Sequence, residues 1–176
     1  APLAAHAGVL GMPGLTAWAG ITQLAKVGAG ATVLVDAAAG PVGGTVGQIA
    51  RIKGATRVVG SAGGPEKCAL VTDTYGFDAC IDYKADGWRD RLAEALQDGL
   101  SVFFENDSAD KAGVYDFYPR WDEYVAEAAP WITSGKLKFA EDRVEGLDNA
   151  PALFARLMAG QNRGKAVVTV AAEKRL

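Results

Sequence analysis

The sequence predicts an α/β protein whose strands form a doubly wound parallel sheet. Three observations indicate this fold class. Short apolar, β-branched runs alternate along the chain with segments whose apolar residues recur at helical spacing. The strand-like runs show no polar alternation, which is typical of strands covered on both faces. Glycine makes up 22 of the 176 residues, and many glycines fall where a strand would meet a helix.

The predicted elements follow one another with short connections. The first part is expected to contain helices over 16–27, 41–53, 65–75 and 88–97 and strands over 31–35, 57–60, 79–82 and 101–105. The rest is expected to contain helices over 121–132 and 149–158 and strands over 137–139 and 166–170. Because the alternation stops after Asn106, where a strand or two is missing, the sheet is predicted to be truncated.

Composition and charge argue against several classes of function. With 18 Lys and Arg against 21 Asp and Glu, the formal net charge is -3, so neither nucleic acid nor a membrane surface is an expected partner. No leader or spanning segment is visible, and a cytoplasmic location is expected. His6 is the single histidine, and no metal site is predicted. Cys68 and Cys80 are interpreted as small core residues rather than as a disulfide framework.

A glycine-rich turn after the first strand is the main candidate for a ligand site. Ala38, Gly40 and Gly43 have the spacing of the dinucleotide-binding G-x-G-x-x-G motif, with alanine in the first position. Gly40 would let the backbone approach a pyrophosphate, and Gly43 would let the helix pack closely on the strand. Pro41 suits the first helical turn, where free N–H groups favour a diphosphate. The motif alone is weak, but its position between a buried strand and an amphipathic helix strengthens it.

The residues after the second strand bear on which dinucleotide binds. An NAD-selective site usually has Asp or Glu at this position, whereas here Ser61 is followed by Ala62, Gly63 and Gly64. Ser61 and Lys67 offer a hydroxyl group and a positive charge that suit a 2′-phosphate. Tyr83, at the end of the next strand, adds a phenol. These residues favour NADPH, although Lys67 taken without the glycine turn would be interpreted as a solvated helix lysine.

Motifs in one order along the chain then suggest a family. They are Leu10–Ala17, Ala37–Gly43, Asp82–Lys84, Phe104–Asn106, Gly135–Leu137, Val144–Pro151 and Gly160–Lys165. Together they resemble the medium-chain dehydrogenase/reductase superfamily, and within it the zinc-independent branch of prostaglandin reductases, alkenal double-bond reductases and curcumin reductase.

The resemblance implies a Rossmann-type domain that binds NADPH for hydride transfer to the carbon-carbon double bond of α,β-unsaturated ketones or aldehydes. It also implies a small enone or alkenal as substrate and a homodimer, and no catalytic residue is assigned. The implied cofactor contacts are Gly40, Pro41, Val42 and Gly43 for the diphosphate, Lys67 and Tyr83 for the 2′-phosphate, Asn106 and Asn162 for the nicotinamide half, and Met12 and Thr16 for its surroundings.

The chain departs from the family pattern in two places. A substrate domain should precede the segment at 10–17, and further strands should lie where only 107–114 connect two elements. The predicted organisation is a remnant of the substrate-domain connection over 1–14, an NADP-binding domain over 15–145 that is shortened near 107–114, and a C-terminal helix and strand over 146–176. Two other functions stay open: a non-catalytic nucleotide-binding module and an NADPH quinone reductase.

Overall fold

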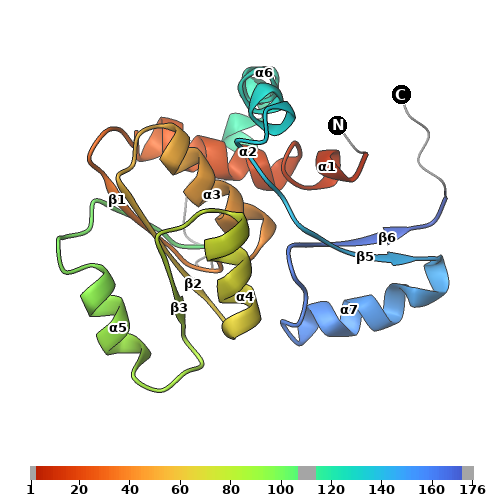
Figure 1. The fold of residues 1–176 in the computed structure, drawn as a ribbon. Coiled ribbons are helices and arrows are strands. Elements are labelled where there is room, and N and C mark those ends of the chain that lie inside the picture. Colours follow the sequence, from red (N-terminus) through yellow and green to blue (C-terminus); the bar gives the residue numbers. More distant parts are fainter. Residues whose placement is uncertain (1–2, 107–113, 172–176) are drawn as a thin grey trace.

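The computed structural model describes residues 3–106 and 114–171. It contains a four-stranded and a two-stranded sheet with helices around them (Figure 1). The helices are α1 (Leu3–Ala7), α2 (Met12–Trp18), α3 (Pro41–Ile52), α4 (Pro65–Ala69), α5 (Trp88–Ala95), α6 (Trp121–Thr133) and α7 (Ala150–Met158), with π-helical turns η1 (Ala19–Leu24) and η2 (Leu70–Thr74) and 3-10 turns η3 (Val114–Arg120) and η4 (Leu147–Asn149). The strands are β1 (Thr32–Val35), β2 (Arg57–Ala62), β3 (Ala79–Asp82), β4 (Val102–Phe104), β5 (Glu141–Glu145) and β6 (Lys165–Thr169).

The larger sheet is parallel throughout and confirms the predicted fold class. Its strand order is β3-β2-β1-β4, with Val33 of β1 opposite both Val58 of β2 and Val102 of β4. The chain therefore runs from β1 to β3 in one direction and then returns to the other side of β1. This reversal places a topological switch point at the carboxyl ends of β1 and β4, where sheets of this kind bind ligands.

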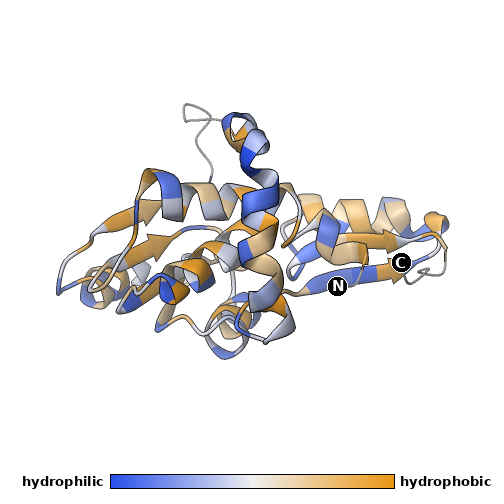
Figure 2. Ribbon diagram, turned by 90° about the horizontal axis from the view of Figure 1, so that it is seen from above, coloured by the Kyte–Doolittle hydropathy of each residue, from blue (hydrophilic) through white to orange (hydrophobic). Residues whose placement is uncertain are grey.

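Side chains alternate along each strand, so both faces of this sheet pack against helices. The two apolar clusters that result differ in size. Val33 and Val35 of β1 join the main core with residues of α2, α3 and η2, whereas Leu34 faces the opposite side. There Leu34 packs with residues of β2, β3 and α5. The strands of this sheet are accordingly hydrophobic along most of their length (Figure 2). In the described part of the chain, no helix is both long and apolar enough to cross a membrane.

The second sheet differs from its prediction. Residues 137–139, expected as a strand, form no strand, and Leu137 instead lies almost completely buried in the main core. The strand is the polar segment β5, which pairs with β6 in parallel and is connected to it by α7. The apolar character of 137–139 therefore reflects burial, and the prediction of a strand there was wrong.

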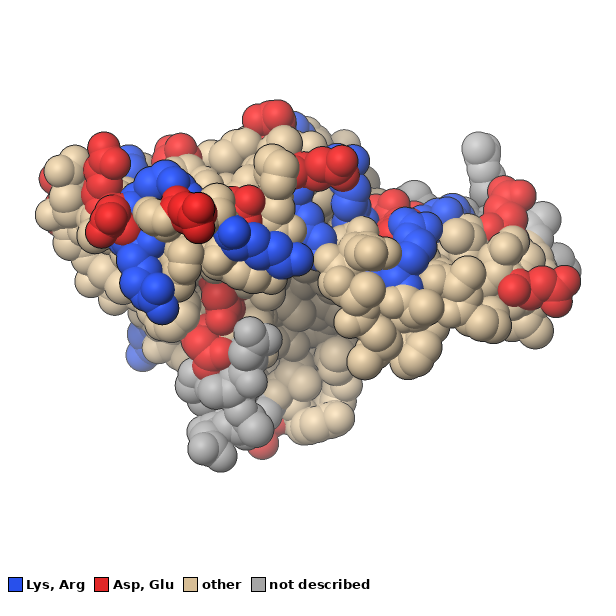
Figure 3. Space-filling model, turned by 90° about the horizontal axis from the view of Figure 1, so that it is seen from below, with Lys and Arg blue, Asp and Glu red and all other residues tan. Residues whose placement is uncertain are grey.

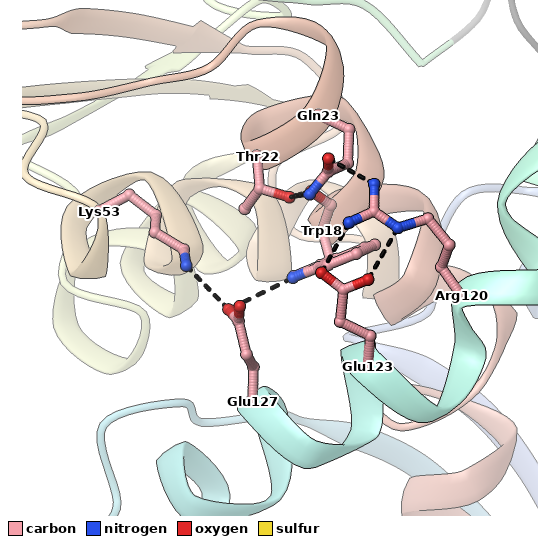
Figure 4. Close-up of polar contacts among 7 residues, drawn as sticks. All are labelled: Trp18, Thr22, Gln23, Lys53, Arg120, Glu123 and Glu127. Carbon is pink, nitrogen blue, oxygen red and sulfur yellow. Dashed lines mark hydrogen bonds and ion pairs between the residues drawn. The ribbon is translucent and has the colours of Figure 1, made fainter.

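Two sets of polar contacts fasten the outer elements to the main core. The buried side chain of Gln48 on α3 donates to the Lys138 carbonyl at 2.8 Å and accepts from its N–H at 2.7 Å, which fixes the segment leading to β5. On α6, Glu127 accepts from Lys53 at 2.8 Å and from the Trp18 indole at 3.4 Å (Figure 4). A second carboxylate of α6, Glu123, makes a bidentate ion pair with the Arg120 guanidinium.

Candidate cofactor-binding site

The glycine turn lies at the carboxyl end of β1 and is shaped by close backbone approaches. Gly40 is the N-cap of α3 and Pro41 its first residue. A Cβ on Gly43 would lie 2.5 Å from the Ala37 carbonyl oxygen, and one on Gly40 would lie 3.1 Å from the same atom. Ala37 has a positive φ of 45°, which tightens the turn. The turn thus has the close packing of helix against strand that the motif predicts for Gly43, since a side chain there would collide with the backbone of the turn.

A hollow of about 200 Å³ opens beside this turn, and it brings four of the predicted residues together. Gly40, Lys67, Tyr83 and Asn162 all line it, although they come from four separate segments of the chain. The remaining lining is small: Ala37, Ala39, Ala62 and Gly63. Asn162 reaches the hollow from the loop between α7 and β6, where its Nδ2 donates to the Gly164 carbonyl at 2.9 Å.

Two lysines make this hollow favourable for an anion. Lys67 is partly buried, and loss of hydration together with repulsion from Lys84 lowers its pKa. A bound dianion would relieve both effects, because it would neutralise the like charges and replace lost water contacts. The nearby carboxylate of Asp82 is occupied by backbone amides, accepting from Gly64 at 2.8 Å and from Lys84 at 3.0 Å. Figure 3 shows one face of the molecule, on which both signs of charge lie side by side and which is hollowed near its middle.

A second hollow, of about 370 Å³, lies next to β4 and contains two further predicted residues, Thr16 and Asn106. Asn106 follows β4 and is held by Asp36 of the glycine turn. Its Nδ2 donates to the Asp36 carbonyl at 2.8 Å and to the carboxylate at 3.0 Å, and its backbone N–H donates to the same carboxylate at 2.7 Å. The second hollow is thus connected through Asn106 to Asp36, which directly precedes the turn that lines the first hollow.

The remaining predicted residues line neither hollow. Ser61 belongs to β2, and its carbonyl accepts from the Ala38 N–H at 2.9 Å, so its backbone supports the turn. Met12 is 46% exposed at the start of α2, and its carbonyl accepts from Thr16. Val42 and Gly43 lie in the first turn of α3, where their N–H groups have no acceptor within the helix by its geometry. Pro41 has no N–H to contribute.

Sequence reasoning did not single out Asp36, which orients Asn106, or Ala37, whose carbonyl sets the packing against Gly43. Asp36 directly precedes the recognised turn, so its position in the motif was the available signal. The structure corrects the prediction for the two cysteines. Cys68 of α4 and Cys80 of β3 are half-buried and joined as a disulfide, whereas they were interpreted as unconnected core residues.

The arrangement can bind a phosphate-bearing ligand beside the glycine turn, and it holds the side-chain amide of Asn106 in a fixed position next to Asp36. Within residues 3–106 and 114–171, no three side chains of His, Cys, Asp or Glu are grouped so as to hold a metal ion. A dinucleotide with an additional phosphate fits the donors that are present: free amides at the start of α3, the Lys67 ammonium and the Tyr83 phenol. No acid at the end of β2 competes with that phosphate.

Comparisons with known proteins agree with this geometry. A family model described as zinc-binding dehydrogenase matches residues 41–112. The NADPH-dependent curcumin reductase of Escherichia coli is 33% identical over 218 residues, covering 94% of this chain and 63% of the relative. The NADP-dependent 2-alkenal reductase of Nicotiana tabacum is 32% identical and is covered over 64% of its length. The solved structure of CurA from Vibrio vulnificus in complex with NADPH has a TM-score of 0.87 at 32% identity, covering 97% of this chain and 66% of that one.

The chain therefore spans less than two thirds of the length of the curated relatives that it matches. The aligned stretch of 218 residues also exceeds the 176 residues of this chain, so at least 42 positions of that relative, the difference, have no counterpart within the alignment. The predicted place of shortening, 107–114, lies almost entirely outside the described residues. With its parallel sheet, its glycine turn and these relatives, the chain is similar to the zinc-independent curcumin and alkenal reductases of the medium-chain dehydrogenase/reductase superfamily.

Proposed function

We propose that this chain is the cofactor-binding part of an NADPH-dependent oxidoreductase that reduces the carbon-carbon double bond of α,β-unsaturated ketones or aldehydes. The observation that carries the proposal is the single hollow lined by Gly40, Lys67, Tyr83 and Asn162 beside the glycine turn. The names of the relatives supply the reaction class, since curcumin reductase and 2-alkenal reductase are both NADPH- or NADP-dependent.

Each group has a separate task in the proposed binding mode. The N–H groups of Val42 and Gly43 bind the diphosphate, and the start of α3 adds a favourable dipole. Lys67 and Tyr83 bind the 2′-phosphate. Asn106 contacts the nicotinamide half and keeps a fixed orientation because Asp36 accepts both from its amide and from its backbone N–H. Asn162 closes the hollow from the second sheet.

When bound, NADPH supplies the hydride, and the protein supplies position and electrostatics. The chain's own contribution is to hold the nicotinamide half at the switch point, beside the hollow that Thr16 and Asn106 line. The remaining parts of the proposal are predictions from the sequence. They are an enone or alkenal as substrate, a homodimeric assembly, a cytoplasmic location, and cofactor contacts by Ser61 and Met12. The three-part division at residues 14 and 145 is likewise a prediction.

The test is a titration of this chain with NADPH and with NADH, followed by nucleotide fluorescence. Wild type should bind NADPH more tightly, and Lys67→Ala should weaken NADPH binding by roughly 10- to 100-fold while leaving NADH binding nearly unchanged, because loss of one charge-assisted phosphate contact costs about 1.5–3 kcal/mol. Lys26→Ala, an exposed lysine outside both hollows, is the matched control. Saturable binding of neither nucleotide would refute the cofactor assignment.

A nucleotide-binding module without turnover is the second candidate, and the missing aligned positions favour it. The two candidates differ in one measurement. Chain saturated with NADPH is mixed with a conjugated enone, and the absorbance of the reduced nicotinamide is followed. Enone-dependent oxidation supports the reductase, whereas stable binding without oxidation supports the module. Oxidation by a quinone but by no enone would instead favour a quinone reductase.

A further inference from the structure

We propose that Cys68 and Cys80 form a reversible oxidation site that controls how firmly Lys67 is held at the 2′-phosphate hollow. This inference rests on the proposed NADPH site for its consequence, but the oxidation itself is independent of it. The two residues lie on different elements, α4 and β3, with a Cα–Cα distance of 5.2 Å and a sequence separation of 12. That distance is within the range in which a disulfide closes without backbone movement.

The position of the pair connects it to the hollow. The stretch from Gly64 to Cys68 contains Lys67 and is attached to β3 at both ends. At one end the Gly64 N–H donates to the Asp82 carboxylate at 2.8 Å, and at the other end Cys68 is bonded to Cys80. Lys67 therefore lies between two attachments to the same strand. When the disulfide is reduced, one of these attachments is lost and the other remains.

Lys67 lies on the less buried part of its helix, because the buried residues Leu70 and Val71 belong to the following turn η2. Helix α4 has five residues, none of which is fully buried, and it continues directly into the π-helical turn η2. Loss of the covalent bond should therefore allow Lys67 more freedom before a ligand binds. Ordering that freedom on binding lowers affinity, so the bonded state is the one prearranged for a 2′-phosphate.

The chemistry balances with an ordinary peroxide as oxidant. One thiol loses its proton, and its thiolate attacks hydrogen peroxide to give a sulfenic acid and a hydroxide, which takes up that proton as water. The second thiol then displaces the sulfenic hydroxyl as another water while the sulfur-sulfur bond forms. Two thiols and one peroxide thus give one disulfide and two waters. A dithiol such as dithiothreitol returns two electrons and two protons. Both cysteines are half-buried rather than enclosed, so small reagents reach them.

The experiment compares the chain reduced with dithiothreitol and the same chain treated with hydrogen peroxide. Free thiols are counted by alkylation and mass spectrometry, and both forms are titrated with NADPH and NADH. We expect two reactive thiols before and none after treatment, restored by dithiothreitol. The oxidised form should bind NADPH roughly 3- to 10-fold more tightly, with NADH binding unchanged, as expected for a prearranged contact.

Cys68→Ser and Cys80→Ser are the matched controls, since each retains one thiol and neither forms the bond. In both, peroxide should leave the ratio of NADPH to NADH affinity at the reduced wild-type value. Two thiols still alkylated after peroxide would overturn the oxidation site. A disulfide that forms without changing the affinity ratio would overturn the control of Lys67. Binding of neither nucleotide by either form would refute the proposed function, while the thiol count would still decide whether the site oxidises.

Discussion

At the scale of single residues, the main core of this protein depends on glycines where a side chain has no room. Gly47 lies in the middle of α3, and a Cβ there would lie 2.0 Å from the ring of the buried Phe77. Gly43 approaches the backbone of the cofactor turn in the same way. The helix therefore lies close to its neighbours, which is the packing that the third glycine of a dinucleotide motif provides.

Gly47→Ala should destabilise the protein by about 1–3 kcal/mol, because overpacking the contact with Phe77 outweighs the gain in helix propensity of about 1 kcal/mol. The free energy of unfolding measured in urea checks this. Gly28→Ala is the control, since its Cβ would meet nothing within 4 Å and its φ is not positive, and it should leave stability within about 0.5 kcal/mol. An equal effect of both substitutions would contradict the packing argument.

Residue identity predicted the site better than it predicted the cysteines. Gly40 and Lys67 lie far apart in the sequence, but each follows a parallel strand, and the carboxyl ends of such strands meet at one edge of the sheet. Their convergence in one hollow could therefore be expected. Cys68 and Cys80 gave no comparable signal, because their pairing depends on how α4 lies against β3, which no local pattern specifies.

At the scale of elements, the side chain of Gln48 fastens α3 to the segment that leads into β5. Gln48 is 5% exposed and makes two hydrogen bonds with the backbone of Lys138, besides donating to the Gly44 carbonyl. Gln48→Ala should lower the free energy of unfolding by about 2–4 kcal/mol, since it leaves the partly buried N–H and carbonyl groups of Lys138 without their partner. Gln97→Ala, at an exposed position after α5, should change it by less than about 0.5 kcal/mol.

Hydrogen exchange locates the effect of Gln48→Ala. The amides of Lys138 and of the neighbouring β5 should lose protection in this variant, while those of β1 to β3 keep it. Uniform loss across both sheets would mean that the contact supports the whole fold rather than the junction.

Elements with buried apolar faces were predicted within a few residues, as β3 and α6 show. Those whose existence depends on a distant partner were not. The segment that forms β5, Glu-Asp-Arg-Val-Glu, has little apolar content, and it becomes a strand only because β6 pairs with it. Leu137 and Phe139 have the apolar character of a strand, yet they pack on the main core from a segment that forms no strand. Local pattern reports burial more directly than pairing.

At the scale of the whole molecule, the connection between the sheets also contains a buried titratable group. Tyr75 follows η2 and is 7% exposed, and burial raises its pKa to about 12, against a hydrogen bond with the Ala140 backbone that lowers it. Burial likewise raises the pKa of Tyr124, which lies on the buried side of α6. In both cases the neutral phenol is favoured by the fold, so ionisation and unfolding are linked.

Because the folded pKa of Tyr75 lies above its unfolded value of 10.0, the stability that it contributes is complete below pH 10 and is lost as the pH rises toward about 12. The loss approaches ~3 kcal/mol for a shift of this size. Tyr75→Phe removes this titration, so the free energy of unfolding should fall less steeply between pH 10 and 12 in the variant than in wild type, while Tyr124 keeps its share in both. Urea unfolding at closely spaced pH values gives the free energy of unfolding of each protein as a function of pH. Subtracting one curve from the other removes the contribution of the lysines, which ionise in both proteins. Parallel curves would contradict the prediction. They would mean that Tyr75 becomes accessible to solvent by local opening of the contact between the two sheets, before the whole fold unfolds.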